Sequence, residues 1–186
     1  MYRRLLPHFG DLAAFLAFLE RKGEVKRIAQ PVDMRLEATE IHRRVIAEGG
    51  PVLRFDAAET AAGRSPMPVI TNLFGTRERV AAGLGADVAG LEALGEFLAS
   101  LRSPRPPASL SEATGMLPIA RAALNARPKI GRDAAPWPAV SPDLSALPVQ
   151  TCWPGDAGPL ITWGIVITRP PGADDPASYN LGVYRL

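Results

Sequence analysis

The sequence holds a single cysteine, Cys152, and only two histidines, His8 and His42. One cysteine excludes an intrachain disulfide and is typical of a reducing compartment, so we expect a cytoplasmic protein. Two isolated histidines do not form a metal site, because such sites need three or four ligands. Cys152 is therefore expected to be a small buried hydrophobic residue.

Long apolar runs and blocks of like charge are also missing. No stretch approaches the roughly 20 apolar residues that a membrane-spanning helix needs, and Pro7 and Asp11 interrupt the basic, apolar start too early for a secretory signal. The 21 basic and 19 acidic residues leave a formal charge of +2, without a basic patch. We expect neither a transmembrane segment nor a nucleic-acid partner.

Helical and strand patterns fill the first hundred residues. Apolar residues at positions 12, 15, 16 and 19 follow Asp11 and precede Gly23, which predicts a first helix with Asp11 as its N-cap. A second helix is expected over 36–47, with acidic residues early and arginines late, as the helix dipole favours. Thr76 can cap a short third helix, and leucines from 91 to 101 predict a fourth. Strands are expected at 25–28, 51–56 and 67–74, with a polar loop between the last two.

Prolines are dense between residues 103 and 148. Because each proline removes a backbone donor and restricts the residue before it, long regular structure is excluded there. We expect a connector over 106–148 with one surviving helix at about 119–126.

A strongly apolar segment follows the connector. Residues 160–168 (LITWGIVIT) are apolar on both alternating faces, which predicts a central strand. Residues 169–178 have turn composition, and 179–186 is expected to be the partner strand. Since the sequence ends inside that strand, we expect a portion of a longer chain. Trp153 and Trp163 are interpreted as core aromatics.

Several segments carry a family resemblance in the same order along the chain. They are 180–185 (NLGVYR), 151–154 (TCWP) with 159–164 (PLITWG), and, upstream, 23–28 (GEVKRI), 36–41 (LEATEI) and 68–75 (PVITNLFG). Together they resemble the UbiD family of carboxy-lyases, whose namesake decarboxylates 3-octaprenyl-4-hydroxybenzoate in ubiquinone synthesis.

The resemblance implies a chemistry and a set of partners. Members of the family remove CO2 from aromatic or unsaturated acids without net oxidation, using prenylated FMN with Mn2+ and K+ at its phosphate. A flavin prenyltransferase supplies the cofactor, the enzymes are homo-oligomers, and a polyprenylated substrate brings the protein to the membrane periphery. The proton donor and the remaining metal ligands of the family belong to a later segment than Leu186.

The same resemblance assigns roles to residues near the end of the chain. Asn180 corresponds to a metal ligand, and Val183, Tyr184 and Arg185 correspond to residues that line the cofactor. Arg185 also corresponds to the arginine of the family's catalytic network. Thr162 is a weaker candidate for a cofactor contact.

Spacing agrees with these roles and sets a condition on them. Five positions on a strand span roughly 16 Å at about 3.3 Å per residue, which is close to the length of FMN from phosphate to ring. Gly182 would let the backbone approach the cofactor. An odd separation puts Asn180 and Arg185 on opposite faces of a regular strand, so a bulge or strand end is required near Tyr184.

The expected fold class is α+β. An N-terminal α/β domain over 1–105 precedes the connector over 106–148, and 149–186 would form the first strands of a split β-barrel resembling flavin reductases. The barrel follows from the resemblance alone. The function expected is decarboxylation by the longer enzyme. The alternatives are a non-catalytic fragment or assembly module, and an FMN-binding reductase-like protein.

Overall fold

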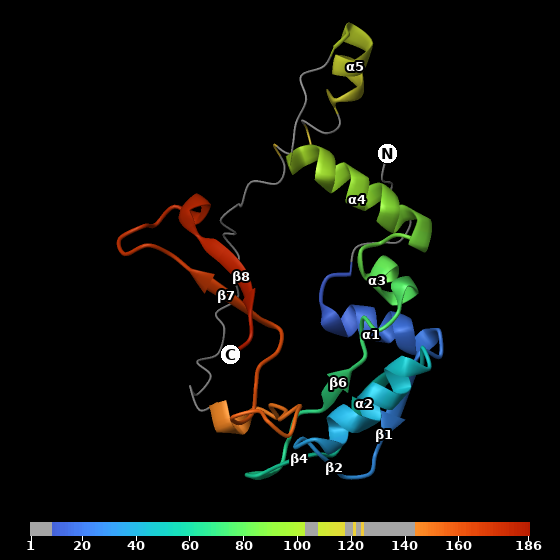
Figure 1. Ribbon diagram of the computed structural model, residues 1–186, viewed down its shortest axis with the longest axis vertical. Coiled ribbons are helices and arrows are strands. Elements are labelled where there is room, and N and C mark those ends of the chain that lie inside the picture. The colour runs from blue at the N-terminus through green and yellow to red at the C-terminus, as the bar shows by residue number, and fades with distance from the viewer. Residues whose placement is uncertain (1–8, 103–107, 118–120, 122–123, 125–143) are drawn as a thin grey trace. The chain divides into compact units, whose positions relative to one another are not determined.

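The computed structural model describes residues 9–102, 108–117, 121, 124 and 144–186 (Figure 1). Contacts divide the chain into two compact units. The N-terminal unit comprises 1–102 with 143–161, and the hairpin unit comprises 103–142 with 162–186. This division differs from the predicted boundaries, because residues 149–161 group with the N-terminal residues rather than with the terminal strands.

A three-stranded sheet organises the N-terminal unit. Its strands are β1 (Val25–Ile28), β3 (Val52–Phe55) and β6 (Val69–Thr71), in the order β1-β3-β6. The β1 and β3 strands are parallel, with α2 (Glu37–Ala47) between them in sequence, as a crossover requires. β6 runs antiparallel to β3. The expected strands and the second helix are therefore confirmed.

A second, very small sheet was not predicted. It consists of β2 (Val32–Asp33), β4 (Ala58–Thr60) and β5 (Gly63–Arg64), in the order β2-β4-β5. The sequence pattern after β3 predicts only a loop. Strands of two or three residues are too short to show an alternating pattern, so their pairing is visible only in the structure.

The first, third and fourth predicted helices are also present, and the first and third have the expected N-caps. In α1 (Leu12–Arg21), the Asp11 carboxylate accepts a hydrogen bond from the Ala14 N–H at 2.7 Å. In α3 (Arg77–Gly83), the Thr76 hydroxyl oxygen accepts from the Arg79 N–H at 3.3 Å. The fourth helix is α4 (Val88–Arg102). None of the helices in the described part of the chain is long and apolar enough to cross a bilayer.

Two buried clusters use opposite faces of β3. Val52 packs with Phe15, Leu19 and Ala82, whereas Leu53 and Phe55 pack with residues of α2, β2 and β4. This follows from the alternation of side chains along a strand. Leu12 was expected in the buried face of α1 but is exposed. It is the first residue of the helix, and the buried contacts of α1 begin one turn later.

The predicted connector is only partly described. A short helix, α5 (Leu110–Gly115), lies in it although none was expected there. The helix predicted over 119–126 falls outside the described residues, apart from Arg121 and Leu124. A 3-10 turn, η1 (Leu144–Ala146), lies at the start of the segment 143–161, which belongs to the N-terminal unit.

The hairpin unit ends in two antiparallel strands, β7 (Gly164–Thr168) and β8 (Asn180–Tyr184). Between them lies a turn with η2 (Pro176–Ser178), which confirms the expected turn. The predicted strand over 160–168 forms only in its second half. The expectation of a central strand is wrong for the described residues, since β7 pairs with β8 alone. An apolar sequence on both faces makes burial possible, but burial needs packed neighbours. The split β-barrel remains a prediction.

Candidate functional site

The register of the hairpin decides which candidate residues share a face. Asn180 pairs with Thr168, and Tyr184 pairs with Gly164. Because side chains alternate along a strand, Asn180, Gly182 and Tyr184 lie on one face of β8. The side chain of Val183 lies on the opposite face, so only its backbone can join Asn180 and Tyr184 in lining one ligand.

The opposite face is aliphatic and largely exposed. Its four side chains are between 61% and 67% exposed: Ile165, Ile167, Leu181 and Val183. The register places Ile165 opposite Val183 and Ile167 opposite Leu181. The face with Asn180 and Tyr184 is thus mixed, since it also holds Thr168 and Val166, whereas the other face is purely aliphatic.

Arg185 lies just beyond the end of β8. The strand ends at Tyr184, and the Arg185 side chain is exposed. The condition set by the odd spacing between Asn180 and Arg185 is therefore met, because a residue outside the strand is not bound to its alternation. Thr162, the weaker candidate, is exposed and precedes β7 by two residues.

Tyr184 covers Gly182. A Cβ added to Gly182 would collide with the Tyr184 ring, lying 3.0 Å from Cζ and 3.1 Å from Oη. The phenol therefore leans back along β8 over the glycine. The expectation that Gly182 exposes its backbone to a ligand must be corrected on this face, because the space that the missing side chain leaves is filled by an aromatic ring.

The segment 151–154 is fixed in the N-terminal unit instead. Thr151 forms a parallel bridge with Arg35, its carbonyl accepts from the Leu36 N–H at 2.9 Å, and its N–H donates to Met34. Asp156 then accepts hydrogen bonds from the backbone N–H groups of Cys152 and Trp153.

The expectation that both tryptophans are core aromatics is wrong. Trp153 is 54% exposed and Trp163 is 74% exposed. Trp153 belongs to the turn that Asp156 closes, and residues 153–155 of that turn are exposed. Cys152, expected to be buried, is half-buried. Aromatic residue type predicts burial on average, and the local turn overrides that average here.

A hollow lies where this segment meets α2. It has a volume of roughly 270 Å³ and is lined by Leu36, Thr39, Glu40, Cys152, Trp153 and Pro154. Leu36 occupies the left-handed region, with φ at 71°. No local sequence signal could have found this hollow, because it depends on the pairing of Arg35 with Thr151.

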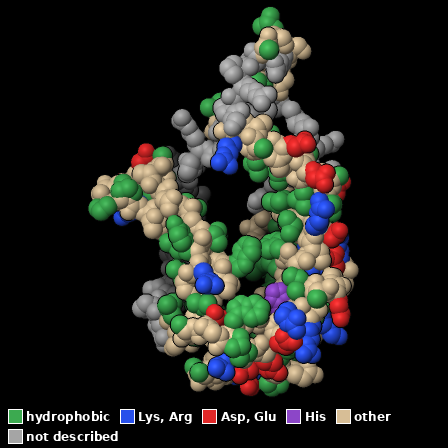
Figure 2. All heavy atoms as spheres, in the orientation of Figure 1, with side chains coloured by type: hydrophobic (Ala, Val, Ile, Leu, Met, Phe, Trp, Pro, Cys, Tyr) green, Lys and Arg blue, Asp and Glu red, His purple; other side chains and the backbone are tan. Residues whose placement is uncertain are grey.

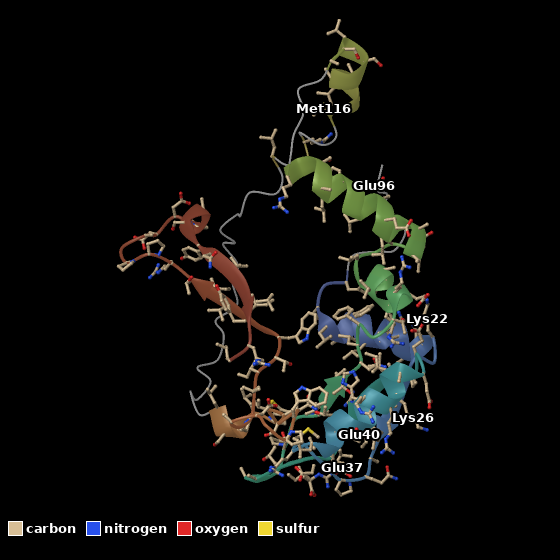
Figure 3. The ribbon with its side chains drawn as sticks, viewed as in Figure 1. Lys22, Lys26, Glu37, Glu40, Glu96 and Met116 are labelled. Atoms are coloured by element: carbon tan, nitrogen blue, oxygen red, sulfur yellow. The ribbon has the colours of Figure 1, made fainter. Side chains whose placement is uncertain are left out.

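Glu40, the acidic residue that lines the hollow, forms ion pairs with two arginines of the same helix. Glu40 accepts hydrogen bonds from Arg43 and Arg44 at 2.7 Å, and these bonds lower the pKa of Glu40 to about 2. Figure 3 shows Glu37 and Glu40 on α2, and the Glu37 carboxylate accepts from the Asp33 N–H. Figure 2 shows acidic and basic side chains interspersed on this face of the unit. Glu40 is thus suited to an ion pair rather than to proton transfer near neutral pH.

A complete metal site is not found in the described part of the chain. No group of three or more histidine, cysteine, aspartate or glutamate side chains lies there in a position to hold an ion. Asn180 offers an exposed amide oxygen at the start of β8, which is a donor that hard divalent ions accept. Among the described residues, Asn180 is thus chemically suited to supply one oxygen ligand to a divalent ion.

Two family models match consecutive parts of this chain. The N-terminal domain of 3-octaprenyl-4-hydroxybenzoate carboxy-lyase, UbiD_N, matches residues 16–98. The Rift-related domain of the same carboxy-lyase, UbiD, matches residues 130–186, which include the whole β7–β8 hairpin.

Solved structures are similar over nearly the whole chain. The UbiD-class enzyme HmfF from Pelotomaculum thermopropionicum, in complex with FMN, is 30% identical, with a TM-score of 0.58 over 94% of this chain and 33% of that one. An evolved dimeric form of HmfF in complex with prFMN is also 30% identical, with a TM-score of 0.57, over 94% of this chain and 35% of that one.

A more distant structure shares the fold. The vanillic acid decarboxylase of Sedimentibacter hydroxybenzoicus, in open form, is 23% identical, with a TM-score of 0.67, over 96% of this chain and 36% of that one. The chain thus spans about a third of the length of these structures.

Proposed function

Since the chain belongs to the UbiD family of carboxy-lyases, we propose that it is the N-terminal third of a decarboxylase dependent on prenylated FMN. The substrate class is an aromatic or unsaturated carboxylic acid. The observation that carries the proposal is the match of the N-terminal and Rift-related family domains, in order, to a chain that contains the segment 180–185.

The proposed roles rest on the chemistry of the hairpin. Asn180 would ligate Mn2+ at the cofactor phosphate, with K+ beside it, and the Val183 backbone and Tyr184 would line the cofactor. Prenylated FMN supplies the electron sink that loss of CO2 requires. Arg185 would hold the substrate carboxylate in bidentate fashion, which a guanidinium does better than an ammonium. What supports this division is that Asn180 starts β8 and Arg185 follows its end.

A finer proposal concerns the substrate and the assembly. The matching family domains are those of a 3-octaprenyl-4-hydroxybenzoate carboxy-lyase, and we infer a prenylated 4-hydroxybenzoate in ubiquinone synthesis as the substrate. Such a substrate would keep a cytoplasmic enzyme near the membrane surface. A flavin prenyltransferase would supply the cofactor, and a homo-oligomer is the expected assembly.

The second candidate is a non-catalytic fragment or assembly module. It is favoured by the chain spanning about a third of its structural relatives. It is also favoured by the N-terminal unit having buried clusters of its own. On this reading, the 186 residues fold but bind neither prenylated FMN nor Mn2+ tightly.

A chimera tests the first candidate. This chain would replace the matched third of HmfF, and the product would be loaded with prenylated FMN and Mn2+. We expect cofactor binding, followed by titration of flavin absorbance, and CO2 release from at least one acid in a panel that includes prenylated 4-hydroxybenzoates. Asn180→Ala should weaken binding at least about tenfold with Mn2+ present, and Arg185→Lys should lower kcat/KM far more than binding.

Leu181→Ala is the matched control, since Leu181 lies on the opposite face of β8. A chimera that folds and binds the cofactor but releases no CO2 from any acid contradicts the decarboxylase proposal. NADH oxidation by the loaded chimera would favour a reductase instead. CO2 release by the 186-residue chain alone would contradict its proposed incompleteness.

A further inference from the structure

Two buried polar side chains converge on one backbone carbonyl in the N-terminal unit. The Asn72 amide nitrogen donates to the carbonyl oxygens of Gly50, at 3.0 Å, and Pro51, at 2.8 Å. Arg79 Nη2 donates to the same Gly50 oxygen at 3.0 Å. These bonds join the end of β6 and α3 to the turn that follows α2. Asn72 belongs to the segment 68–75, which the proposed decarboxylase chemistry does not use.

Burial of the Arg79 guanidinium carries a large desolvation penalty. The Arg79 side chain is only 4% exposed, and the nearest carboxylate, that of Glu24, lies 3.9 Å from Nη1. Burial lowers the pKa of Arg79 from its ordinary value. Arg79 Nε and Asn72 Oδ1 find no hydrogen-bond partner among the described residues. A buried charge of this kind persists only where its remaining bonds hold it firmly.

The local backbone is shaped to admit this arrangement. Asn72 adopts a left-handed conformation, with φ at 60°, which asparagine tolerates better than most residues. A Cβ on Gly75 would collide with Asn72 Oδ1 and lie 3.2 Å from Arg79 Nη2. An asparagine, a glycine three positions later and an arginine four positions after that therefore form one structural motif.

The motif attaches a segment that has little other buried surface. We call residues 77–102, which form α3 and α4, the α3–α4 arm (Figure 1). Its buried side chains, among those that the structure describes, are those of Arg79, Ala81, Ala82 and Ala86. Alanines bury little apolar area, so the guanidinium is by far the largest buried group of the arm.

The outer half of the arm is weakly held. None of the described side chains of α4 is buried, although the helix has 15 residues. Its leucines follow a helical stripe, yet Leu98 is exposed. Segments with few buried apolar contacts open at low free energy. Helix α4 contacts α3. Helix α3 is in turn held by the Arg79 bond to Gly50 and by the small side chain of Ala82, which packs in the cluster around Val52.

We propose that Asn72 and Arg79 form a latch, and that its release lets the α3–α4 arm detach from the sheet as one cooperative segment. The latch is not proposed as a site for an external anion, because the guanidinium already donates to the Gly50 carbonyl and pairs with the Glu24 carboxylate. The inference concerns the conformation of the N-terminal unit and does not depend on the proposed chemistry.

Hydrogen exchange of the whole 186-residue chain, resolved by peptide, tests the latch. Arg79→Met should speed exchange in residues 77–102 at least about tenfold, since the lost bond involves a buried charged group. Exchange in α2 and β3 should change by less than about threefold. The matched control is Arg77→Met, because Arg77 lies on the same helix but makes an exposed ion pair with Glu92 at 3.4 Å.

A second variant covers the case in which Arg79→Met does not fold. Asn72→Gly keeps the left-handed backbone but removes the amide, and it should produce the same regional pattern, only more weakly. In the double variant, the acceleration of exchange in residues 77–102 should be smaller than the combined accelerations of Arg79→Met and Asn72→Gly. This is expected for residues that act together. Uniform acceleration across the unit, no acceleration of the arm, or full additivity would each overturn the latch.

Discussion

The N-terminal unit and the hairpin unit bury their apolar side chains to very different degrees. In the N-terminal unit, Val52 and Phe55 on β3 are fully buried, and clusters pack on both faces of that strand. In the hairpin, the four aliphatic side chains of one face are all more than 60% exposed. A two-stranded hairpin without cover is at best marginally stable in water.

The residues that stabilise the fold and the residues proposed to bind ligands therefore lie in different units. The side chains that hold the fold lie in the N-terminal unit, whereas the proposed ligand-binding residues Asn180 and Arg185 lie on the hairpin. Substitutions on the hairpin should therefore alter binding in the longer enzyme while leaving the N-terminal core intact. Four measurements test this difference between the two units.

The strongest way to break the contrast is to open the core beside β3. Phe55→Ala should lower the free energy of unfolding by about 3–5 kcal/mol, because it removes a fully buried ring and leaves a cavity. Leu181→Ala, on the exposed face of the hairpin, should cost less than about 0.5 kcal/mol. Urea unfolding followed by circular dichroism measures both. Equal losses would show that the hairpin face is covered in solution.

Amide exchange compares the two sheets directly. Backbone amides of β7 and β8 should exchange at least about a hundredfold faster than those of β3, since in the described residues β7 pairs with β8 alone and one face of the pair is largely exposed. The measurement is residue-resolved exchange by NMR on the whole chain. Similar protection of Val183 and Leu53 would refute the contrast.

The pH dependence of stability should reflect the partial burial of His42, which lies in α2 of the N-terminal unit. Burial lowers the pKa of His42 below its ordinary value of about 6.5. The folded state therefore binds fewer protons than the unfolded state, and stability should decrease as the pH falls below about 6.5. Urea midpoints between pH 7.5 and 5 measure the slope. The slope should be smaller in His42→Gln, and an unchanged slope would assign it to another group.

The smallest expected effect concerns the packing of Tyr184 on Gly182. Gly182→Ala should displace the ring, because the new Cβ collides with it. The far end of a flexible, half-exposed side chain moves easily, so stability should change by less than about 0.5 kcal/mol. Loss of the nuclear Overhauser contacts between Tyr184 and residue 182 is the readout. Gly158→Ala, where a Cβ meets nothing within 4 Å, is the control.

Local chemistry made much of the N-terminal unit predictable. Asp11 and Thr76 cap their helices as expected, since a capping bond spans only three residues. Burial was predicted less well than capping, because Leu12, Trp153 and Trp163 are apolar and yet exposed. Residue type predicts only a tendency to be buried.

The candidate site was predictable only as a set of residues. The family resemblance pointed to Asn180, Val183, Tyr184 and Arg185, and the family domains matched the segment that holds them. Their arrangement was not predictable. The register that separates Val183 from Asn180, and the ring of Tyr184 over Gly182, depend on strand pairing and rotamer choice. The roles of these residues stay predictions.

The helix starts, the positions of the main strands and the family can be predicted from the amino-acid order, because each is encoded by residues within a few positions or by an ordered set of short segments. The pairing of Arg35 with Thr151 and the hydrogen bond from Arg79 to the Gly50 carbonyl are visible only in the folded chain. Such contacts join residues far apart in the chain. They form because apolar surfaces pack together and buried polar atoms need hydrogen-bond partners. Both requirements are met by residues that are distant in the sequence, so a local pattern does not predict them.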